Sequence, residues 1–228
     1  MNRISSALLA LAALAVLVAP SLADPVAISN HSFETPDLTA GGNTWSDINL
    51  DWGDDAGASN DQFTEFIPDF ASDGEQHVGV NNSDADMSGA IDPLMQDLAA
   101  TYNALTTYTL TVGVGNRNDD FTPDGNETLI QLADASTGNI LAESIVDASL
   151  IPDGTFEDRS LVYTTGQSGD PIGNNIRIIL GVTGPDVGRG HFDNVRLDAT
   201  VIPEPSSVVL MVLGGLGLFL AARRGRRG

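Results

Sequence analysis

Between residues 24 and 202 the sequence consists of short β-branched and aromatic runs separated by turn-forming residues, and this pattern constrains the fold most strongly. Residues 107–115 alternate apolar side chains with Thr and Gly, as a half-buried strand does. Residues 175–182 form a continuous apolar run that fits a central sandwich strand. Dipeptides such as Asp73-Gly74 and Thr137-Gly138 supply turns between such runs. The pattern predicts an all-β domain, an antiparallel β-sandwich or jelly roll.

One segment, residues 92–103, departs from this pattern. Its apolar residues Leu94, Met95, Leu98 and Ala99 recur at the spacing of one helical face. The segment is predicted to form either a short helix or a turn between strands.

The N-terminus carries an export signal. Arg3 begins a short positive region, residues 7–18 are continuously apolar, and Ser21-Leu22-Ala23 places small residues where a signal peptidase reads them. We therefore predict a signal peptide at 1–23, with an uncleaved N-terminal anchor as the alternative, and a folded domain at 24–202. The partner implied at this end is signal peptidase.

The predicted domain is strongly acidic and lacks both lysine and cysteine. Five arginines and 30 acidic residues lie between 24 and 202, which gives a formal charge of −25. Such a surface repels nucleic acid and favours cations, above all calcium. The absence of cysteine excludes disulfides and thiol catalysis, so a bound metal could take their place as a stabilising link.

The C-terminal residues 203–228 contain three parts in order. Pro203-Glu204-Pro205 is followed by an apolar or glycine run at 208–222, and four arginines close the chain: Arg223, Arg224, Arg226 and Arg227. Fifteen helical residues span about 22 Å, less than the ~30 Å of a bilayer core. The arginines are expected to stay on the cytoplasmic side. A plain membrane anchor is one interpretation of this short C-terminal hydrophobic helix.

The same arrangement closely resembles the PEP-CTERM sorting signal of Gram-negative bacteria. The resemblance implies that an exosortase recognises Pro203, Glu204 and Pro205 and removes the tail. It also implies that the chain is exported through the inner membrane, transiently anchored in it, and delivered to the outer surface or the extracellular polysaccharide matrix. Pro203 and Pro205 keep the triplet extended and accessible to an enzyme.

The interior resembles carbohydrate-binding jelly-roll modules of the family 4/9/22 type, which have a galactose-binding-like fold. The segments ISNHSFETP (28–36) and HFDNVRLDA (191–199) match the opening and closing strands of that group. The resemblance implies a structural Ca²⁺ held by Glu34 and Asp193, one from each end of the domain, because calcium prefers hard oxygen ligands. The alternative is two solvated carboxylates.

A sugar site would need an exposed aromatic face. Trp52 lies among acids and glycine and is the candidate; otherwise it caps the edge of the core. His31, His77 and His191 are far apart in sequence and show no metal-ligand spacing. The sequence therefore predicts that the domain is not an enzyme but a carbohydrate-binding surface protein. A calcium-stabilised matrix protein without a specific ligand is the alternative.

Overall fold

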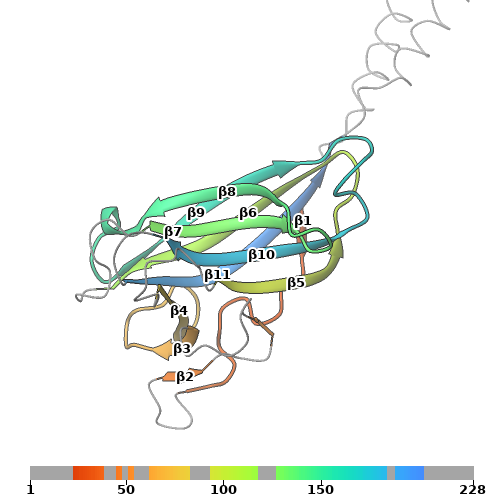
Figure 1. Ribbon diagram of the computed structural model, residues 1–228. Helices are drawn as coiled ribbons and strands as arrows, with labels where there is room; N and C mark the ends of the chain where they lie inside the picture. The colour runs from red at the N-terminus through yellow and green to blue at the C-terminus, as the bar shows by residue number, and fades with distance from the viewer. Residues whose placement is uncertain are drawn as a thin grey trace, which may run out of the picture. The chain divides into compact units, whose positions relative to one another are not determined.

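Eleven strands form two antiparallel sheets in the computed structural model, which describes residues 23–38, 45–47, 51–53, 62–82, 93–117, 127–183 and 188–202. Figure 1 shows the two layers, with the four-stranded sheet against the long strands of the other. The all-β sandwich predicted from the strand and turn pattern is confirmed.

The larger sheet has seven strands in the order β2-β3-β4-β11-β6-β9, with β1 paired to β11. Their bounds are β1 Asp24–Val26, β2 Trp45–Asp47, β3 Gln62–Phe66, β4 Gln76–Asn82, β6 Thr106–Asn116, β9 Thr155–Thr164 and β11 Gly188–Val201. β11 lies between β4 and β6, so the last strand of the domain occupies the middle of this sheet.

The smaller sheet has the order β5-β10-β7-β8. Its strands are β5 Leu94–Thr101, β7 Glu127–Asp134, β8 Ile140–Asp147 and β10 Asn175–Thr183, and a 3-10 turn at Ala148–Leu150 follows β8. The apolar run at 175–182 is the central strand β10, buried between β5 and β7 as expected.

The hydrophobic core lies between the sheets and takes alternate residues from each strand, because successive side chains of a strand point to opposite faces. Its completely buried members come from both layers: Val78, Val80, Leu110, Val112, Val114 and Phe192 from the larger sheet, and Leu94, Ile130, Leu132, Ile176, Ile178 and Leu180 from the smaller. The larger sheet therefore has an inner face, which carries this core, and an outer face, which points away from it.

The helix considered for residues 92–103 is wrong, since this segment forms strand β5. Leu94 and Leu98 are buried in the core. Two residues four positions apart lie on the same face of a helix, and they also lie on the same face of a strand because four is an even number. Pairing of Met95 with Ile179 and of Gln96 with Ile178 on β10 supplies the backbone partners that fix the extended form.

Residues 23–200 form a compact unit whose core is its own. Within the described residues no helix has the length and apolar character needed to cross a membrane. The predicted signal peptide, except for Ala23, and the sorting signal at 203–228 lie outside them.

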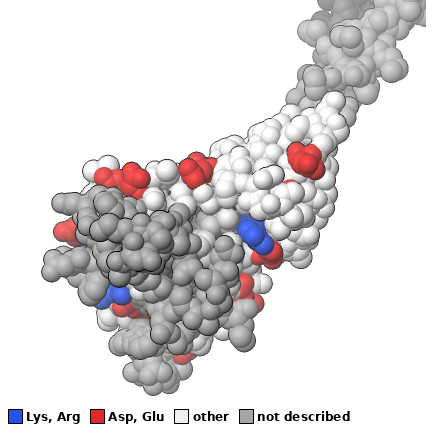
Figure 2. Space-filling view, in the orientation of Figure 1, with Lys and Arg blue, Asp and Glu red and all other residues white. Residues whose placement is uncertain are grey.

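The five arginines of the domain each lie beside an acidic side chain: Arg117 and Arg189 at Glu65, Arg159 at Glu157, Arg177 at Asp97, and Arg196 at Asp158. On the face seen in Figure 2 the acidic residues are scattered among the described residues.

Candidate functional site

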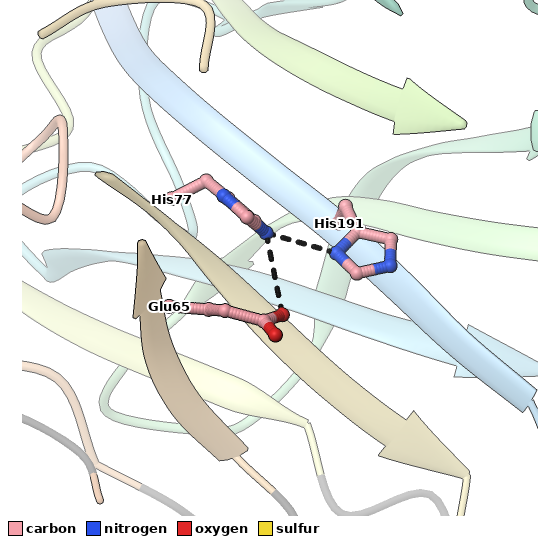
Figure 3. Close-up of side chains that lie close together, drawn as sticks. All are labelled: Glu65, His77 and His191. Atoms are coloured by element: carbon pink, nitrogen blue, oxygen red, sulfur yellow. Dashed lines mark hydrogen bonds and ion pairs between the residues drawn. The ribbon is translucent and has the colours of Figure 1, made fainter. Parts of the chain in front are cut away.

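Three polar side chains meet on the outer face of the larger sheet: Glu65 on β3, His77 on β4 and His191 on β11 (Figure 3). The strand register places them there. Glu65 pairs with His77, and His191 pairs with Gly79, while their neighbours Val78 and Phe192 pair with each other and face the core. Alternation along the strands then directs all three side chains to the outer face.

The two imidazoles are in direct contact and fully buried. His77 Nε2 lies 3.1 Å from His191 Nδ1, and both residues have 0% exposure. Glu65 Oε2 lies 3.7 Å from His77 Nε2, and Glu65 is itself held by Arg117, whose Nη1 donates to both carboxylate oxygens at 3.0 Å. Arg189 Nη1 lies 3.8 Å from Oε2.

Burial keeps both histidines neutral. It lowers the pKa of His77, against the opposing effect of Glu65, and it lowers the pKa of His191 well below its usual value, helped by the charges of Arg189 and Arg117. Burial alone would raise the pKa of Glu65, but His77 and the two arginines outweigh it and lower this pKa. The cluster is thus a carboxylate beside two neutral imidazoles.

One tautomer fits this arrangement. When His77 Nε2–H donates to His191 Nδ1, the same N–H group also faces the Glu65 carboxylate, which is favourable. If His191 Nδ1–H donated instead, His77 Nε2 would present a lone pair to the negatively charged carboxylate, which is unfavourable. The second nitrogens, His77 Nδ1 and His191 Nε2, then have no hydrogen-bond partner.

The segment between β3 and β4, residues 67–75, lies over the cluster and is called the 67–75 loop below. Phe70 packs edge-on against both imidazoles, with ring centroids 5.0 Å from His77 and 5.5 Å from His191, and it also contacts Phe156 at 4.6 Å. A hollow of about 480 Å³ is lined by Phe66, Gly74, Glu75 and residues 67–71. Phe70 therefore belongs both to the wall of this hollow and to the cover of the imidazoles.

Glycines on β6 allow this close cover. A Cβ on Gly113 would lie 2.9 Å from Ser72 Oγ, and one on Gly115 would lie 2.6 Å from the Phe156 ring. Any larger residue at these two positions would push the loop or the Phe156 ring away from the sheet.

The calcium candidates Glu34 and Asp193 both bind the 67–75 loop and the residue that follows it. Asp193 Oδ2 accepts from the amides of Ser72 and Asp73 at 2.6 and 2.8 Å. Glu34 Oε1 accepts from the amides of Glu75 and Gln76 at 2.8 and 2.9 Å. The two carboxylates anchor the loop, and calcium at these residues stays a prediction that the melting temperature with and without EDTA checks.

Asp193 is an unusual anchor because it is completely buried. Burial raises its pKa to about 7 although three backbone amides, those of Ser72, Asp73 and Asn194, favour the ionised form.

Trp52, expected to be an exposed binding platform, is instead 3% exposed. Its indole Nε1–H donates to the carbonyls of Ser29 and Asn30, and its ring packs 5.3 Å from that of Phe33. The neighbours Asp51 and Gly53 are exposed as residues, but their backbone hydrogen-bonds to Gln96 and Met95 of β5, which holds the Trp52 ring inward. The alternative, that Trp52 caps the core, fits this position.

The sequence positions of the three histidines predict no shared site, and for His77 and His191 this prediction is wrong. They are 114 residues apart, and only the adjacency of β4 and β11 brings them together. His31, by contrast, is exposed and lies outside the cluster.

The chain thus contains a β-sandwich domain of jelly-roll type with a buried cluster of two imidazoles and a carboxylate on one face of its larger sheet. The profile of the HpiC1-like family, described as HpiC1 cyclase, matches residues 24–198, and the chain belongs to this family. The PEP-CTERM protein-sorting motif matches residues 201–227, which confirms that part of the sequence-based identification. The motif implies export, processing by an exosortase and membrane-associated sorting to the cell surface.

Solved cyclases from Fischerella share the fold. A Stig cyclase from Fischerella sp. TAU, solved with (3Z)-3-(1-methyl-2-pyrrolidinylidene)-3H-indole, has a TM-score of 0.66 and 22% identity over 79% of this chain and 100% of its own. A cyclase from the same source with 4-(1H-indol-3-yl)butan-2-one gives 0.65 and 22%, with the same coverage. An apo cyclase from Fischerella sp. gives 0.64 and 23% over 78% of this chain and 96% of that one. No curated protein matches this chain in sequence.

The expectation that the domain is not an enzyme is therefore wrong, because its family is one of cyclases and ligand-bound cyclases share its fold. Carbohydrate-binding modules are also among the structural neighbours. A xylan-binding module has a TM-score of 0.42 and 14% identity over 81% of this chain, a likeness too slight to support sugar binding.

Proposed function

We propose that the domain is a surface-sorted cyclase that closes a ring in a small, largely apolar organic molecule at the Glu65–His77–His191 cluster. The observation that carries this proposal is the family match over residues 24–198. The ligands named for two structurally similar cyclases are both 3-substituted indoles. We infer that compounds of this class are the first substrates to test.

The cluster supplies the groups that such a reaction needs. Cation-driven ring closure adds a proton to one carbon, forms a carbon–carbon bond and releases a proton from another carbon, so the substrate is isomerised and no redox partner is consumed. Because both imidazoles are neutral at rest, one of them first takes a proton from water, and the Glu65 carboxylate stabilises the imidazolium so formed. The imidazolium donates this proton to one carbon of the substrate, and after ring closure the neutral imidazole accepts the proton that another carbon releases.

The hollow beside the 67–75 loop is the inferred binding site for the substrate. Its volume of about 480 Å³ lies within the ~300–1,000 Å³ range of small-molecule sites. Phe70 stands between this hollow and the imidazoles, so its ring must swing aside before a substrate reaches His77 or His191.

The test uses purified residues 24–202, the unit that contains its own core. Binding of 4-(1H-indol-3-yl)butan-2-one is followed by NMR, and alkenyl-bearing 3-substituted indoles are incubated with the domain and analysed for an isomer of unchanged mass. The proposal expects shifts at Phe70 and its neighbours, and conversion that His77→Gln abolishes. His31→Phe, a change at an exposed histidine, is the matched control. Neither binding nor isomerisation across the panel would refute the proposal.

A second candidate is binding of extracellular polysaccharide at the outer surface of a Gram-negative cell, favoured by the sorting motif at 201–227. Trp52 is buried and does not supply the aromatic face expected for it. A glycan array with the same domain separates this candidate from the first, and retention of wild-type signal by a Trp52→Phe variant would exclude Trp52 as the contact. Melting temperature with and without EDTA tests the related alternative, a calcium-stabilised matrix protein.

A further inference from the structure

We propose that Glu65, His77 and His191 bind a divalent transition-metal ion such as Zn²⁺. The three ligand atoms come from adjacent strands of one sheet face and all lie within 4.8 Å of one another. No other group of three or more histidine or acidic side chains among the described residues comes together in this way. The inference concerns the same three residues as the cyclase proposal but rests on their geometry and not on the family match. An ion bound there would occupy the nitrogens that the cyclase proposal uses for proton transfer, so each proposal has its own test.

The spacing of the two nitrogens suits a shared ion. Two ligands with bonds of about 2.1 Å at a tetrahedral angle lie about 3.4 Å apart, and at a right angle about 3.0 Å apart. His77 Nε2 and His191 Nδ1 are 3.1 Å apart, and Glu65 Oε2 is 3.7 Å from His77 Nε2. Small side-chain rotations therefore bring the three atoms around one ion.

Burial gives a second reason. Both imidazoles are fully buried, so the two atoms that face each other, His77 Nε2 and His191 Nδ1, are shielded from competing water. The unpaired nitrogens, His77 Nδ1 and His191 Nε2, are not the ligand atoms, and with an ion bound they carry the ring protons. An ion would replace the single hydrogen bond between the rings with two stronger bonds.

The ligand set also selects the metal. Two imidazole nitrogens and one carboxylate oxygen suit Zn²⁺ and similar ions, whereas Ca²⁺ prefers six to eight oxygens. Arg117 donates to both oxygens of Glu65 and so fixes the carboxylate, as outer partners of metal ligands do. Its charge and that of Arg189 oppose a cation, so we expect moderate rather than very tight binding.

The experiment titrates EDTA-treated, buffer-exchanged residues 24–202 with Zn²⁺ by calorimetry at pH 7.5, in 1 mM Ca²⁺ to saturate oxygen-only sites. The expected result is one Zn²⁺ per chain and a melting temperature that rises with Zn²⁺ concentration. His191→Phe should weaken this binding at least about 100-fold. His31→Phe, which removes the exposed histidine, should bind as the wild type does.

A measurement on the unmodified chain keeps the test independent of how the variants fold. The imidazole ¹⁵N signals of His77 and His191 should shift on addition of one equivalent of Zn²⁺, while those of His31 stay in place. Absence of saturable binding, or binding that shifts only His31, would overturn the metal site and leave the cyclase proposal to its own assay.

Discussion

The two faces of the larger sheet come from the same strands but carry different side chains: the inner face is apolar, and the outer face holds the polar cluster. On β4 and β11 the inner residues Val78 and Phe192 complete an apolar core, while the outer residues His77 and His191 place two imidazoles beside a carboxylate. The inner face is closed by a second sheet, which is regular and extensive. Around the cluster, the outer face is covered by the 67–75 loop, which two carboxylates hold in place. Substitutions on the inner face are therefore expected to affect the core, and substitutions on the outer face to affect the cluster and the loop that covers it.

The largest expected effect is on the inner face. Phe192→Ala removes a completely buried ring from the centre of the sheet and should lower the free energy of unfolding by about 3–5 kcal/mol. Urea denaturation measures it. Val162→Ala, on the 59%-exposed side chain of β9, is the control and should cost less than about 0.5 kcal/mol. Equal losses in the two variants would show that the inner face does not carry the stability.

The next effect is on the loop that closes the outer face. Asp193→Ala leaves the amides of Ser72 and Asp73 without their acceptor and should cost about 2 kcal/mol. Amide hydrogen exchange should accelerate at these two residues and not in β10. Unchanged exchange at Ser72 would mean that Asp193 does not anchor the loop.

A smaller effect concerns pH. Burial would raise the pKa of Asp134 on β7, but hydrogen bonds from Asn174, Ser136 and Thr137 outweigh it and lower this pKa below 3.8. The folded state then binds this proton less readily than the unfolded state does. The contribution of Asp134 is therefore present above pH 3.8 and is lost as the pH falls through the folded pKa.

Asp134→Asn should accordingly cost about 1 kcal/mol at pH 7 and flatten the acid side of the stability profile. Asp193 acts oppositely: its pKa of about 7 makes its contribution fall as the pH rises from 3.8 through 7. Urea midpoints from pH 3 to 8 for wild type, Asp134→Asn and Asp193→Asn measure both slopes, and a common slope in all three would contradict the assignment.

The smallest expected effect on stability is at the cluster itself. His191→Phe keeps an aromatic ring beside Phe70 and removes a buried polar group, so the free energy of unfolding should change by less than about 1 kcal/mol. A loss as large as that of Phe192→Ala would break the contrast between the two faces. Urea denaturation of the two variants side by side decides between these outcomes.

Local pattern was enough to predict the sandwich but not its site. The alternation at 107–115 and the apolar run at 175–182 became β6 and β10, because each strand needs only its own period to be recognised. The apolar spacing of the segment at 92–103 fits both a helix and a strand. The segment becomes a strand because β5 pairs with β10, about 80 residues further along the chain. The sequence of the segment alone does not show which strand it will pair with.

The cluster depends on strand order even more strongly. Glu65, His77 and His191 meet only because β3, β4 and β11 are neighbours in the right register. The available signal was alternation: His77 and His191 each stand next to a residue that reads as core, Val78 and Phe192, which directs both imidazoles to the opposite face. The resemblance to sugar-binding modules and the search for an aromatic platform point to Glu34, Asp193 and Trp52, and all three side chains hydrogen-bond to backbone groups in the structure.

The position of β11 near the end of the domain determines the stage of export at which the cluster can form. Asp193 reaches back 121 residues to Ser72, and His191 reaches back 114 residues to His77. Both belong to the last strand, which ends at Val201, where the match to the sorting motif begins. During export from the N-terminus the first ten strands can emerge without a complete cluster or a doubly anchored loop. Under the proposed function, a partly translocated chain therefore cannot bind or convert a substrate at the cluster, because the cluster is complete only after β11 has emerged.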